Sequence, residues 1–189
     1  MIEDLIKKNR SYRRFKQNEK VDFQTLKNLV KLARCSASGM NKQPIKFYLA
    51  NDKKTNNKIF PALSWAGSLK NWEGPEKGER PAAYIILLGD KNIRKSFGVD
   101  HGIMAQSILL GAVEKGYGGC MLGAIDRNLL RENLDIKDDY EILLVLALGK
   151  PAEKVILENA IDGNVTYYRD KKDNHHVPKR PIDELIVNP

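Results

Sequence analysis

The most regular pattern in the chain begins at Asp22, where apolar side chains start to recur at helical spacing. Asp22 is a residue type that caps helix N-termini, and the apolar residues after it lie along one stripe up to Ala33. Small polar residues and a glycine follow in the segment Cys35–Gly39. The pattern therefore predicts an amphipathic helix of about three turns that ends in a loop.

Short apolar runs predict the strands. Ile45–Ala50, Ala82–Leu88 and Ile142–Leu148 are candidates, and the last two runs contain no polar residue apart from one tyrosine. Such runs are typical of strands buried on both faces of a sheet. The other expected elements are a helix over Asp100–Gly116, a glycine-rich strand or turn over Gly118–Gly123 and a short helix from Asp126 to about Leu134.

Two segments have neither a helical nor a strand period. Ser64–Pro81 holds both tryptophans among glycines, prolines and charges, and we expect a long surface loop that shapes a substrate pocket. From about Pro151 the chain is polar and irregular, with two short β-prone pieces at Val165–Tyr168 and His175–Pro178. Such a tail buries too little apolar surface to fold alone, so we expect an arm wrapped over the domain or over a second subunit.

The order of these elements predicts the fold class. Strands separated by helices and long connections favour an α+β fold, with a mixed central sheet flanked by helices on both sides. A chain of 189 residues is long enough to bury a core without disulfide or metal support. We therefore expect a single domain over residues 1–189.

Composition narrows the class of protein. The hydrophobic fraction of 42% and the charged fraction of 30% are ordinary for a soluble globular chain. No apolar run approaches the roughly 20 residues that cross a bilayer, and the N-terminus lacks an apolar signal segment, so we expect a cytoplasmic protein without membrane contact. Cys35 and Cys120 form no spaced motif, and we expect both to be reduced.

The net charge of +8 is compatible with an anionic cofactor or with nucleic acid. Lys and Arg are mostly interleaved with Asp and Glu, which is typical of a solvated surface. A nucleic-acid-binding module would need exposed aromatic side chains among basic ones on one face, and only Tyr167, Tyr168 and Arg169 fit that description. We expect no nucleic-acid partner and keep this function as the alternative from another class.

Four segments carry candidate chemistry. Arg10–Phe15 places three arginines and a serine together, which suits a phosphate, although a solvated basic turn has the same composition. Ser36–Pro44 offers hydroxyls and carboxamides for a polyol or a ring edge, or serves only to end a helix. Gly116–Gly123 allows backbone to approach a flat ligand but lacks the dinucleotide fingerprint. Lys179–Arg180 is a basic pair on the tail.

The sequence shows no nucleophile with a neighbouring base. It has three histidines and neither a serine elbow nor a metal-binding helix. His175 and His176 are adjacent, but no cysteine or carboxylate spacing accompanies them, so we expect no zinc site. Reactivity would then have to come from a bound cofactor.

Taken in order, these segments resemble the nitroreductase family. Its members share an N-terminal R-S-x-R-x-F stretch, a helix-ending S-x-x-N-x-Q-P loop and a glycine-rich segment. The first two read here Arg10-Ser11-Tyr12-Arg13-Arg14-Phe15 and Ser38-Gly39-Met40-Asn41-Lys42-Gln43-Pro44. The helix Asp100–Gly116, the Gly149-Lys150-Pro151 corner and the basic tail look like later landmarks of the family, so the resemblance spans nearly the whole chain.

The resemblance implies FMN as cofactor and places ten residues around it. The phosphate would be met by Arg10, Ser11, Arg13, Lys179 and Arg180. The ribityl chain and the isoalloxazine would be met by Ser38, Asn41 and Gln43, and backbone of Leu122 and Gly123 would face the N5 and O4 edge. The chain departs from the family at Asn9, where many members have arginine, and at Ala37 and Ile45, where proline and tryptophan are common.

The resemblance also implies an activity and an assembly. NADH or NADPH would reduce the flavin, and a nitroaromatic, a quinone or a related small acceptor would reoxidise it in a ping-pong cycle. The enzyme would be a homodimer joined through its long helices, with the C-terminal arm crossing to the partner. A flavoprotein of the same fold with a different specific redox substrate is the nearest alternative.

Overall fold

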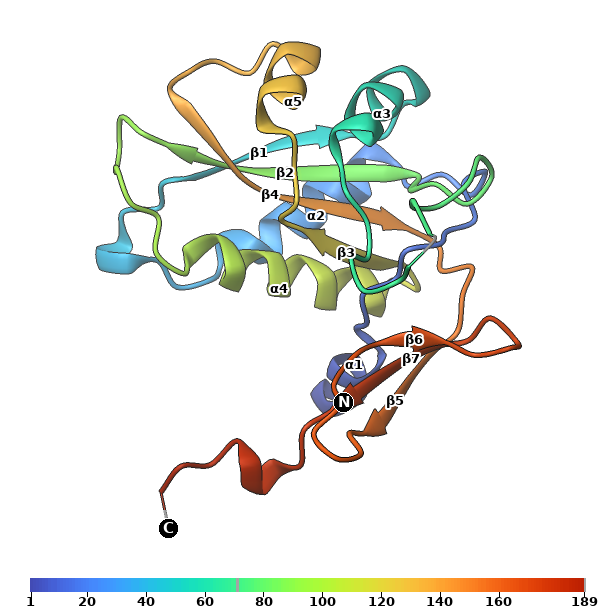
Figure 1. The fold of residues 1–189 in the computed structure, drawn as a ribbon. Coiled ribbons are helices and arrows are strands. Elements are labelled where there is room, and N and C mark those ends of the chain that lie inside the picture. Colours follow the sequence, from blue (N-terminus) through green and yellow to red (C-terminus); the bar gives the residue numbers. More distant parts are fainter. Residues whose placement is uncertain (71, 189) are drawn as a thin grey trace.

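The computed structural model describes residues 1–70 and 72–188, with helices on both faces of a central sheet (Figure 1). The helices are α1 (Ile2–Lys8), α2 (Phe23–Arg34), α3 (Lys53–Ile59), α4 (Asp100–Glu114) and α5 (Arg127–Leu134). The strands are β1 (Ile45–Ala50), β2 (Ala83–Asp90), β3 (Gly118–Leu122), β4 (Tyr140–Gly149), β5 (Val155–Asn159), β6 (Tyr168–Arg169) and β7 (His175–Lys179). This arrangement confirms the predicted α+β class.

The central sheet has the strand order β1-β2-β4-β3, and its strand pairs are antiparallel. Among residues 1–70 and 72–188, the parallel contact of this sheet is an isolated bridge between Ser11 and Gly119, at the outer edge of β3. The two apolar runs expected to be buried on both faces are β2 and β4, which lie in the middle of the sheet. The prediction that these two runs form buried strands is therefore confirmed. The central sheet has less parallel pairing than the expected mixed sheet, because its strand pairs are antiparallel.

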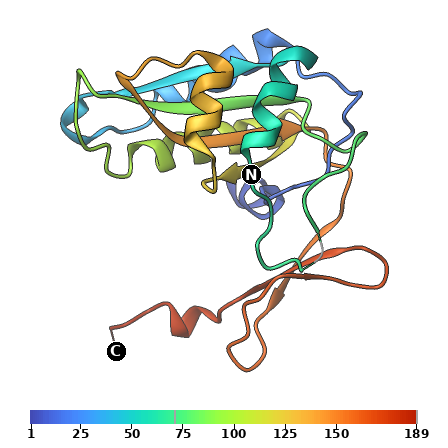
Figure 2. The same ribbon diagram turned by 45° about the horizontal axis from the view of Figure 1, so that its top comes forward.

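The sheet separates two hydrophobic cores. Side chains of β2 point alternately into the two cores, as the two-residue period of a strand requires. Ile85 and Leu87 enter the first core, between the sheet and the helices α2 and α4, and Ile86 enters the second core, on the opposite face. Figure 2 shows α3 and α5 on the face opposite α2 and α4. Phe15, with no exposed surface, belongs to the second core and so anchors the N-terminal segment to the sheet.

The helix predicted from Asp22 is confirmed as α2. The Asp22 carboxylate accepts a hydrogen bond of 2.8 Å from the Thr25 backbone, and the helix ends before Cys35. The helix α3 was not predicted, because among its residues only Ile59 is both apolar and buried, so no stripe is visible. Its start could have been recognised from Asp52, which accepts from the Thr55 backbone at 2.9 Å.

The tail is more ordered than the sequence predicts. After Pro151 it forms a second sheet of order β5-β7-β6, in which β5 and β7 are parallel and β6 and β7 are antiparallel. The expected piece His175–Pro178 lies in β7, whereas the expected piece Val165–Tyr168 shares only Tyr168 with β6. The strand β5 was missed, because its apolar run of three residues is short and lies in a polar segment. This sheet lies beside the main body near α1, and the last residues extend away from it (Figure 1).

The long loop over Ser64–Pro81 has no helix or strand in its described residues, as predicted, with Asn71 lying outside the description. Its tryptophans are not surface side chains, however: Trp65 is buried and Trp72 is half-buried against the second core. Both cysteines are free thiols, as expected. Among the described residues, no helix combines the length and the apolar character needed to span a membrane.

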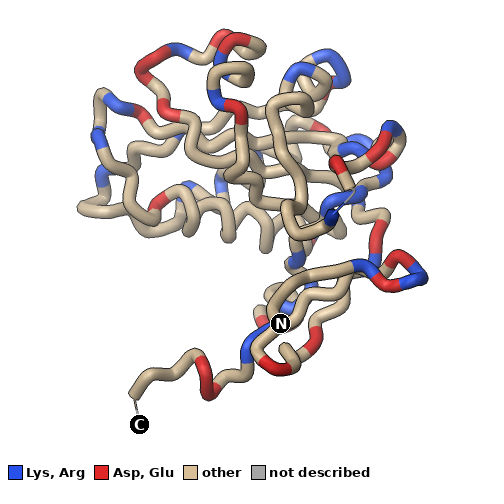
Figure 3. The backbone as a smooth tube through the Cα atoms, viewed as in Figure 1, with Lys and Arg blue, Asp and Glu red and all other residues tan. Residues whose placement is uncertain are grey.

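The distribution of charge agrees with the prediction of a solvated basic surface. Figure 3 shows Lys and Arg spread over the main body and the tail, interleaved with Asp and Glu rather than gathered on one face. Of the three tail residues considered for nucleic-acid binding, Tyr167 and Arg169 contact other side chains of the protein. The guanidinium carbon of Arg13 lies 5.0 Å from the centre of the Tyr167 ring, and Nη2 of Arg169 lies 2.6 Å from Oε2 of Glu153. Tyr167 and Arg169 therefore join the tail to the rest of the fold, whereas Tyr168 is exposed.

Candidate functional site

The arginine-rich segment after α1 runs along the edge of β3. Ser11 bridges Gly119, and the backbone N–H of Tyr12 donates to the Gly119 carbonyl at 3.0 Å. The glycines of β3 make this close approach possible, because a Cβ on Gly118 would collide with the ring of Tyr12. Two of the sequence-predicted segments, Arg10–Phe15 and Gly116–Gly123, are thus brought side by side.

Arg13 is one of several half-buried cations of this region. Its Nη1 atom lies 3.1 Å from Nε2 of His175, and its guanidinium lies over the ring of Tyr167. The Nε atom of Arg13 is buried without a hydrogen-bond partner in the described structure, and so is Nε of Arg10. Because guanidinium N–H groups carry charge and only donate, such unused donors favour an anionic acceptor.

Burial sets the protonation of the histidine beside Arg13. Removal from water, followed by the positive charge of Arg13, lowers the pKa of His175 to about 4. His175 is therefore neutral at neutral pH and accepts from Arg13 at Nε2. His175 is thus an uncharged neighbour that orients the side chain of Arg13.

Glu153 joins the arginine-rich segment to the tail. Its side chain is 2% exposed; Oε1 accepts from the backbone N–H groups of Arg13 and Arg14, and Oε2 pairs with Arg169 at 2.6 Å. A buried carboxylate is stable only when its oxygens are paired in this way. The backbone at Arg13 is consequently fixed by a residue from the first turn of the tail.

A cavity of about 230 Å³ opens next to Arg13 at the end of β3. Its lining includes Leu122 and Gly123, both predicted for the flavin, together with Trp65 and Tyr167. No described atom lies within 4 Å of the place that a Cβ on Gly123 would occupy. Nε1 of Trp65 is also buried without a partner among the described groups. The cavity therefore combines open backbone, aromatic walls and one cation, which suits part of a flat anionic ligand.

The helix-ending loop Ser38–Gln43 is held by Asp100, the first residue of α4. The Ser38 hydroxyl donates to Asp100 at 2.6 Å, and the Gly39 backbone donates to it at 3.1 Å. These hydrogen bonds, led by that of Ser38, lower the pKa of Asp100. The Ser38 oxygen also accepts from the Gln43 backbone at 2.9 Å, so this hydroxyl is already used to shape the loop.

The tip of this loop is strained. Met40, Asn41 and Gln43 have φ angles of 52°, 53° and 50°, in the left-handed region that non-glycine residues rarely adopt. Backbone in this region costs on the order of 1–3 kcal/mol per residue and is concentrated at functional sites. The side chains of Asn41 and Gln43 are exposed and bonded to each other at 3.1 Å, so both remain free to rearrange around a ligand.

One chain does not bring the two halves of the predicted site together. The Ser38–Gln43 loop is tied to Asp100, the first residue of α4. The arginine segment meets the same helix farther along, where Asn9 donates to Gln106 at 3.4 Å, and β3 packs along α4. None of the described hydrogen bonds joins the loop to Arg13 or to β3, and no residue of the loop lines the cavity at Gly123.

Lys179 and Arg180 are exposed at the end of β7. Arg180 pairs with Glu184 at 3.0 Å, and none of the described hydrogen bonds or ion pairs joins either residue to Arg10 or Arg13. The tail instead contributes Tyr167 and His175 to the Arg13 region. The assignment of Lys179 and Arg180 to a phosphate stays a prediction.

Sequence reasoning missed three residues that organise the site: Asp100, Glu153 and Tyr167. Each acts through partners that are distant in sequence, the separation being 62 residues for Asp100 and Ser38 and 140 for Glu153 and Arg13. The one available signal was Asp100, an acidic residue at the start of a largely apolar helix.

Comparison with known proteins identifies the family. The model of the nitroreductase family matches residues 6–150, so the chain belongs to that family and is an oxidoreductase by class. A curated relative, an iodotyrosine deiodinase from Thermotoga neapolitana, is 25% identical over 166 residues, covering 80% of this chain and 89% of the relative.

Two solved structures show the same fold. A nitroreductase family protein from Streptococcus pneumoniae is 17% identical, with a TM-score of 0.71 and 100% of both chains covered. An FMN-dependent nitroreductase from Clostridium difficile is 22% identical, with a TM-score of 0.64, covering 86% of this chain and 92% of that one. The predicted family and fold are thus confirmed.

Proposed function

We propose that the protein is an FMN-dependent oxidoreductase that uses NADH or NADPH to reduce a nitroaromatic, a quinone or a related small acceptor. The observation that carries this proposal is the unused, buried Nε of Arg13 beside the cavity at Gly123, in the segment that the family uses for flavin. When bound, FMN would supply the hydride chemistry, and this chain's own residues would hold and shield it.

The residues present fit the phosphate of FMN. Arg10 and Arg13 offer buried donors without partners, and Ser11 is exposed between them. Arg10 is itself oriented by a hydrogen bond of 2.7 Å from Nη2 to the Ile6 carbonyl at the end of α1. Charge-assisted hydrogen bonds of this kind contribute about 1.5–3 kcal/mol each.

The residues also fit the flat part of FMN. Leu122 and Gly123 present backbone to the cavity, and the missing side chain at Gly123 leaves room for a ring to approach. The cavity holds about 230 Å³, which is less than the 300 Å³ or more that is usual for a whole ligand of this size. A single chain would therefore supply part of the site.

The remaining part would come from the partner in a homodimer. The Ser38–Gln43 loop of one subunit would reach the Arg13 region of the other, which accounts for the absence of this loop from the described lining of the cavity in a single chain. The surface beside that loop is suited to an interface, because Val99, Ile103 and Met40 are 71%, 40% and 79% exposed. The dimer and the flavin site would then form together.

The test begins with the colour of the purified protein. A yellow protein that releases FMN on heating, and whose visible absorbance is bleached by NADH or NADPH without oxygen, supports the proposal. A panel of acceptors should include nitroaromatics, quinones and, because a curated relative is a deiodinase, a halogenated tyrosine. Turnover of one specific acceptor only would favour the alternative of a flavoprotein with a dedicated substrate.

A protein that takes up no FMN at micromolar concentrations would refute the proposal. If it also bound nucleic acid with a steep dependence on salt, the alternative of a basic binding module would replace it.

A further inference from the structure

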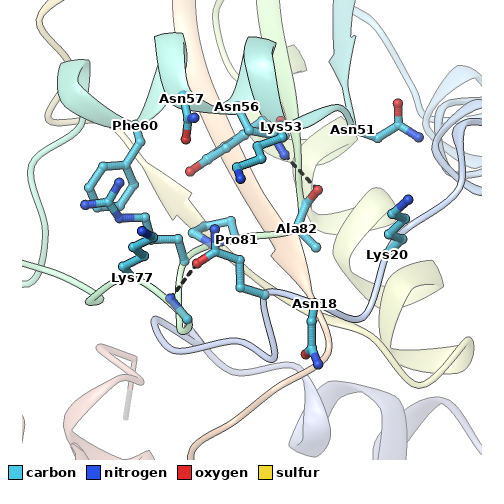
Figure 4. A pocket seen from close by; sticks show the side chains of 14 residues that line it. Asn18, Lys20, Asn51, Lys53, Asn56, Asn57, Phe60, Lys77, Pro81 and Ala82 are labelled. Atoms are coloured by element: carbon cyan, nitrogen blue, oxygen red, sulfur yellow. Dashed lines mark hydrogen bonds between the residues drawn. The ribbon is translucent and has the colours of Figure 1, made fainter.

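The protein has a second cavity, which is separate from the cavity at Gly123. It has a volume of about 630 Å³ and lies between α3, the start of β2 and the segment around Lys20 (Figure 4). None of the ten predicted flavin residues lines it. A cavity of this size is within the range of small-molecule sites.

The charge of the lining has one sign. Lys20, Lys53, Lys77 and Arg80 line the cavity, and no aspartate or glutamate does so among the described residues. None of these cations forms an ion pair with a described carboxylate; the nearby Glu19, for example, pairs with Lys16 and Lys150. Cations that line one cavity without a described counter-charge raise the local concentration of anions.

A flat platform forms one wall. The guanidinium of Arg80 lies 4.0 Å from the centre of the Phe60 ring, and Nε of Arg80 is buried without a partner in the described structure. Arg80 is therefore fixed by the ring while one of its donors stays unused. The buried Tyr84 also lines the cavity, and burial raises the pKa of its hydroxyl, which therefore remains a hydrogen-bond donor.

Asn56 supplies an unused acceptor. Its Nδ2 donates to the Ala82 carbonyl at 2.8 Å, and because a carbonyl cannot donate, this bond fixes which end of the amide is which. The opposite atom, Oδ1, is buried without a partner among the described groups. A buried amide oxygen in this state favours a ligand with an N–H or O–H group. Asn18, Asn51 and Asn57 add further carboxamides around the rim (Figure 4).

We propose that this cavity binds a mononucleotide, that is, a phosphate monoester joined to a planar base. The lysines would meet the phosphate, which accepts several charge-assisted hydrogen bonds at once. The Phe60 ring with Arg80 would provide the stacking surface for the base, and Asn56 would accept from its N–H groups. The site is separate from the proposed flavin site and does not depend on it.

The proposal is tested by isothermal titration calorimetry of the purified full-length protein with AMP, adenosine and ribose 5-phosphate. AMP should bind with a dissociation constant below about 1 mM, and at least about tenfold more tightly than either fragment. Lys53→Gln should weaken AMP by about threefold or more, and the double variant Lys53→Gln with Lys77→Gln by about tenfold or more. Thermal melting of each variant verifies that it is folded.

Lys54→Gln is the matched control, because Lys54 is the next residue of α3 and lines a different cavity. It should leave AMP affinity unchanged, and so should Arg13→Ala, which alters only the proposed FMN site. FMN content is recorded on the same samples, so that failure of one proposal is distinguished from failure of the other. The absence of AMP binding at 5 mM (about five times the expected limit), equal binding of adenosine, or equal loss in Lys54→Gln would overturn the assignment.

Discussion

Nη1 of Arg13 and Nε2 of His175 lie 3.1 Å apart, although 162 residues separate them in the sequence. The contact joins the N-terminal arginine segment to the C-terminal sheet. Arginine only donates, so the histidine accepts and remains neutral, and the charge of Arg13 is left for another acceptor. This relationship makes the tail a structural part of the proposed anion site, even though Lys179 and Arg180 lie elsewhere on it.

The first prediction concerns the phosphate. Arg13→Ala should weaken FMN by about 10- to 150-fold, because one charge-assisted hydrogen bond contributes about 1.5–3 kcal/mol. Riboflavin, which lacks the phosphate, should lose much less affinity. Flavin fluorescence titration measures both ligands, with Arg34→Ala, an exposed arginine at the end of α2, as control. Equal losses for FMN and riboflavin would refute a phosphate contact.

The second prediction concerns pH. The pKa of His175 is lowered to about 4 in the folded chain, below its ordinary value of 6.5. The unfolded chain therefore takes up a proton first as pH falls, so this histidine's contribution to stability is complete above 6.5 and is lost between 6.5 and 4. Urea unfolding of the wild type and of His175→Asn should give a difference in the free energy of unfolding that becomes smaller as the pH falls from 6.5 to about 4.

A difference that stays constant with pH would contradict the neutral state of His175. Because His176 has its pKa raised by Glu158, its contribution runs in the opposite direction. It is present in both proteins and cancels when the two unfolding free energies are subtracted.

The fold was predictable where local signals and burial agree. Asp22 with its apolar stripe specifies α2, and the apolar runs of β2 and β4 specify strands buried on both faces. The second sheet was predictable only in part, since the β-prone run at the start of β5 is three residues long and becomes a strand by pairing with β7. Strand propensity depends on such neighbours, which a single sequence does not reveal.

The third prediction concerns the loop that carries Asn41 and Gln43. Asp100→Asn should lower the free energy of unfolding by about 1–3 kcal/mol. Ser38 and Gly39 donate to different oxygens of the carboxylate, and the substitution replaces one of these oxygens by an NH2 group, which cannot accept. FMN affinity should fall with it, because the strained loop loses its support. Asp138→Asn is the control, as that carboxylate is 97% exposed. Unchanged stability with unchanged FMN binding would show that Asp100 does not position the loop.

The fourth prediction concerns Trp72, which was expected to shape the acceptor pocket. The structure places its ring 5.8 Å from the guanidinium of Arg14 and 5.2 Å from that of Arg169, so it joins the loop to the tail. Trp72→Ala should change the KM for the acceptor and also speed proteolysis of the tail, because both cation–π contacts are lost. Trp72→Phe should retain most of the protection. A variant with altered KM and unchanged proteolysis would assign the ring to the pocket alone.

The site was less predictable than the fold, for a physical reason. Arg13, Leu122 and Gly123 could be proposed from the sequence by resemblance, and the structure places them around one cavity. Glu153 could not, because a buried carboxylate is recognisable only from the backbone N–H groups that it satisfies, here those of Arg13 and Arg14. Positioning residues of this kind belong to the tertiary structure.

The last prediction tests whether the tail, the dimer and the flavin site are one unit. A chain ending at residue 160 loses β6 and β7 and with them Tyr167 and His175, the two side chains that orient Arg13. It should have lower FMN occupancy and a weaker dimer, and added FMN should strengthen the dimer of the full chain by mass action.

The matched control is a chain ending at Arg180, which keeps both strands and removes mainly exposed residues. Analytical ultracentrifugation recorded at the flavin absorbance measures mass and occupancy on the same sample. Because the Ser38–Gln43 loop does not line the described cavity of its own chain, a monomer would leave the proposed site incomplete. A monomer that keeps its full FMN at submicromolar concentration would therefore disprove the shared site.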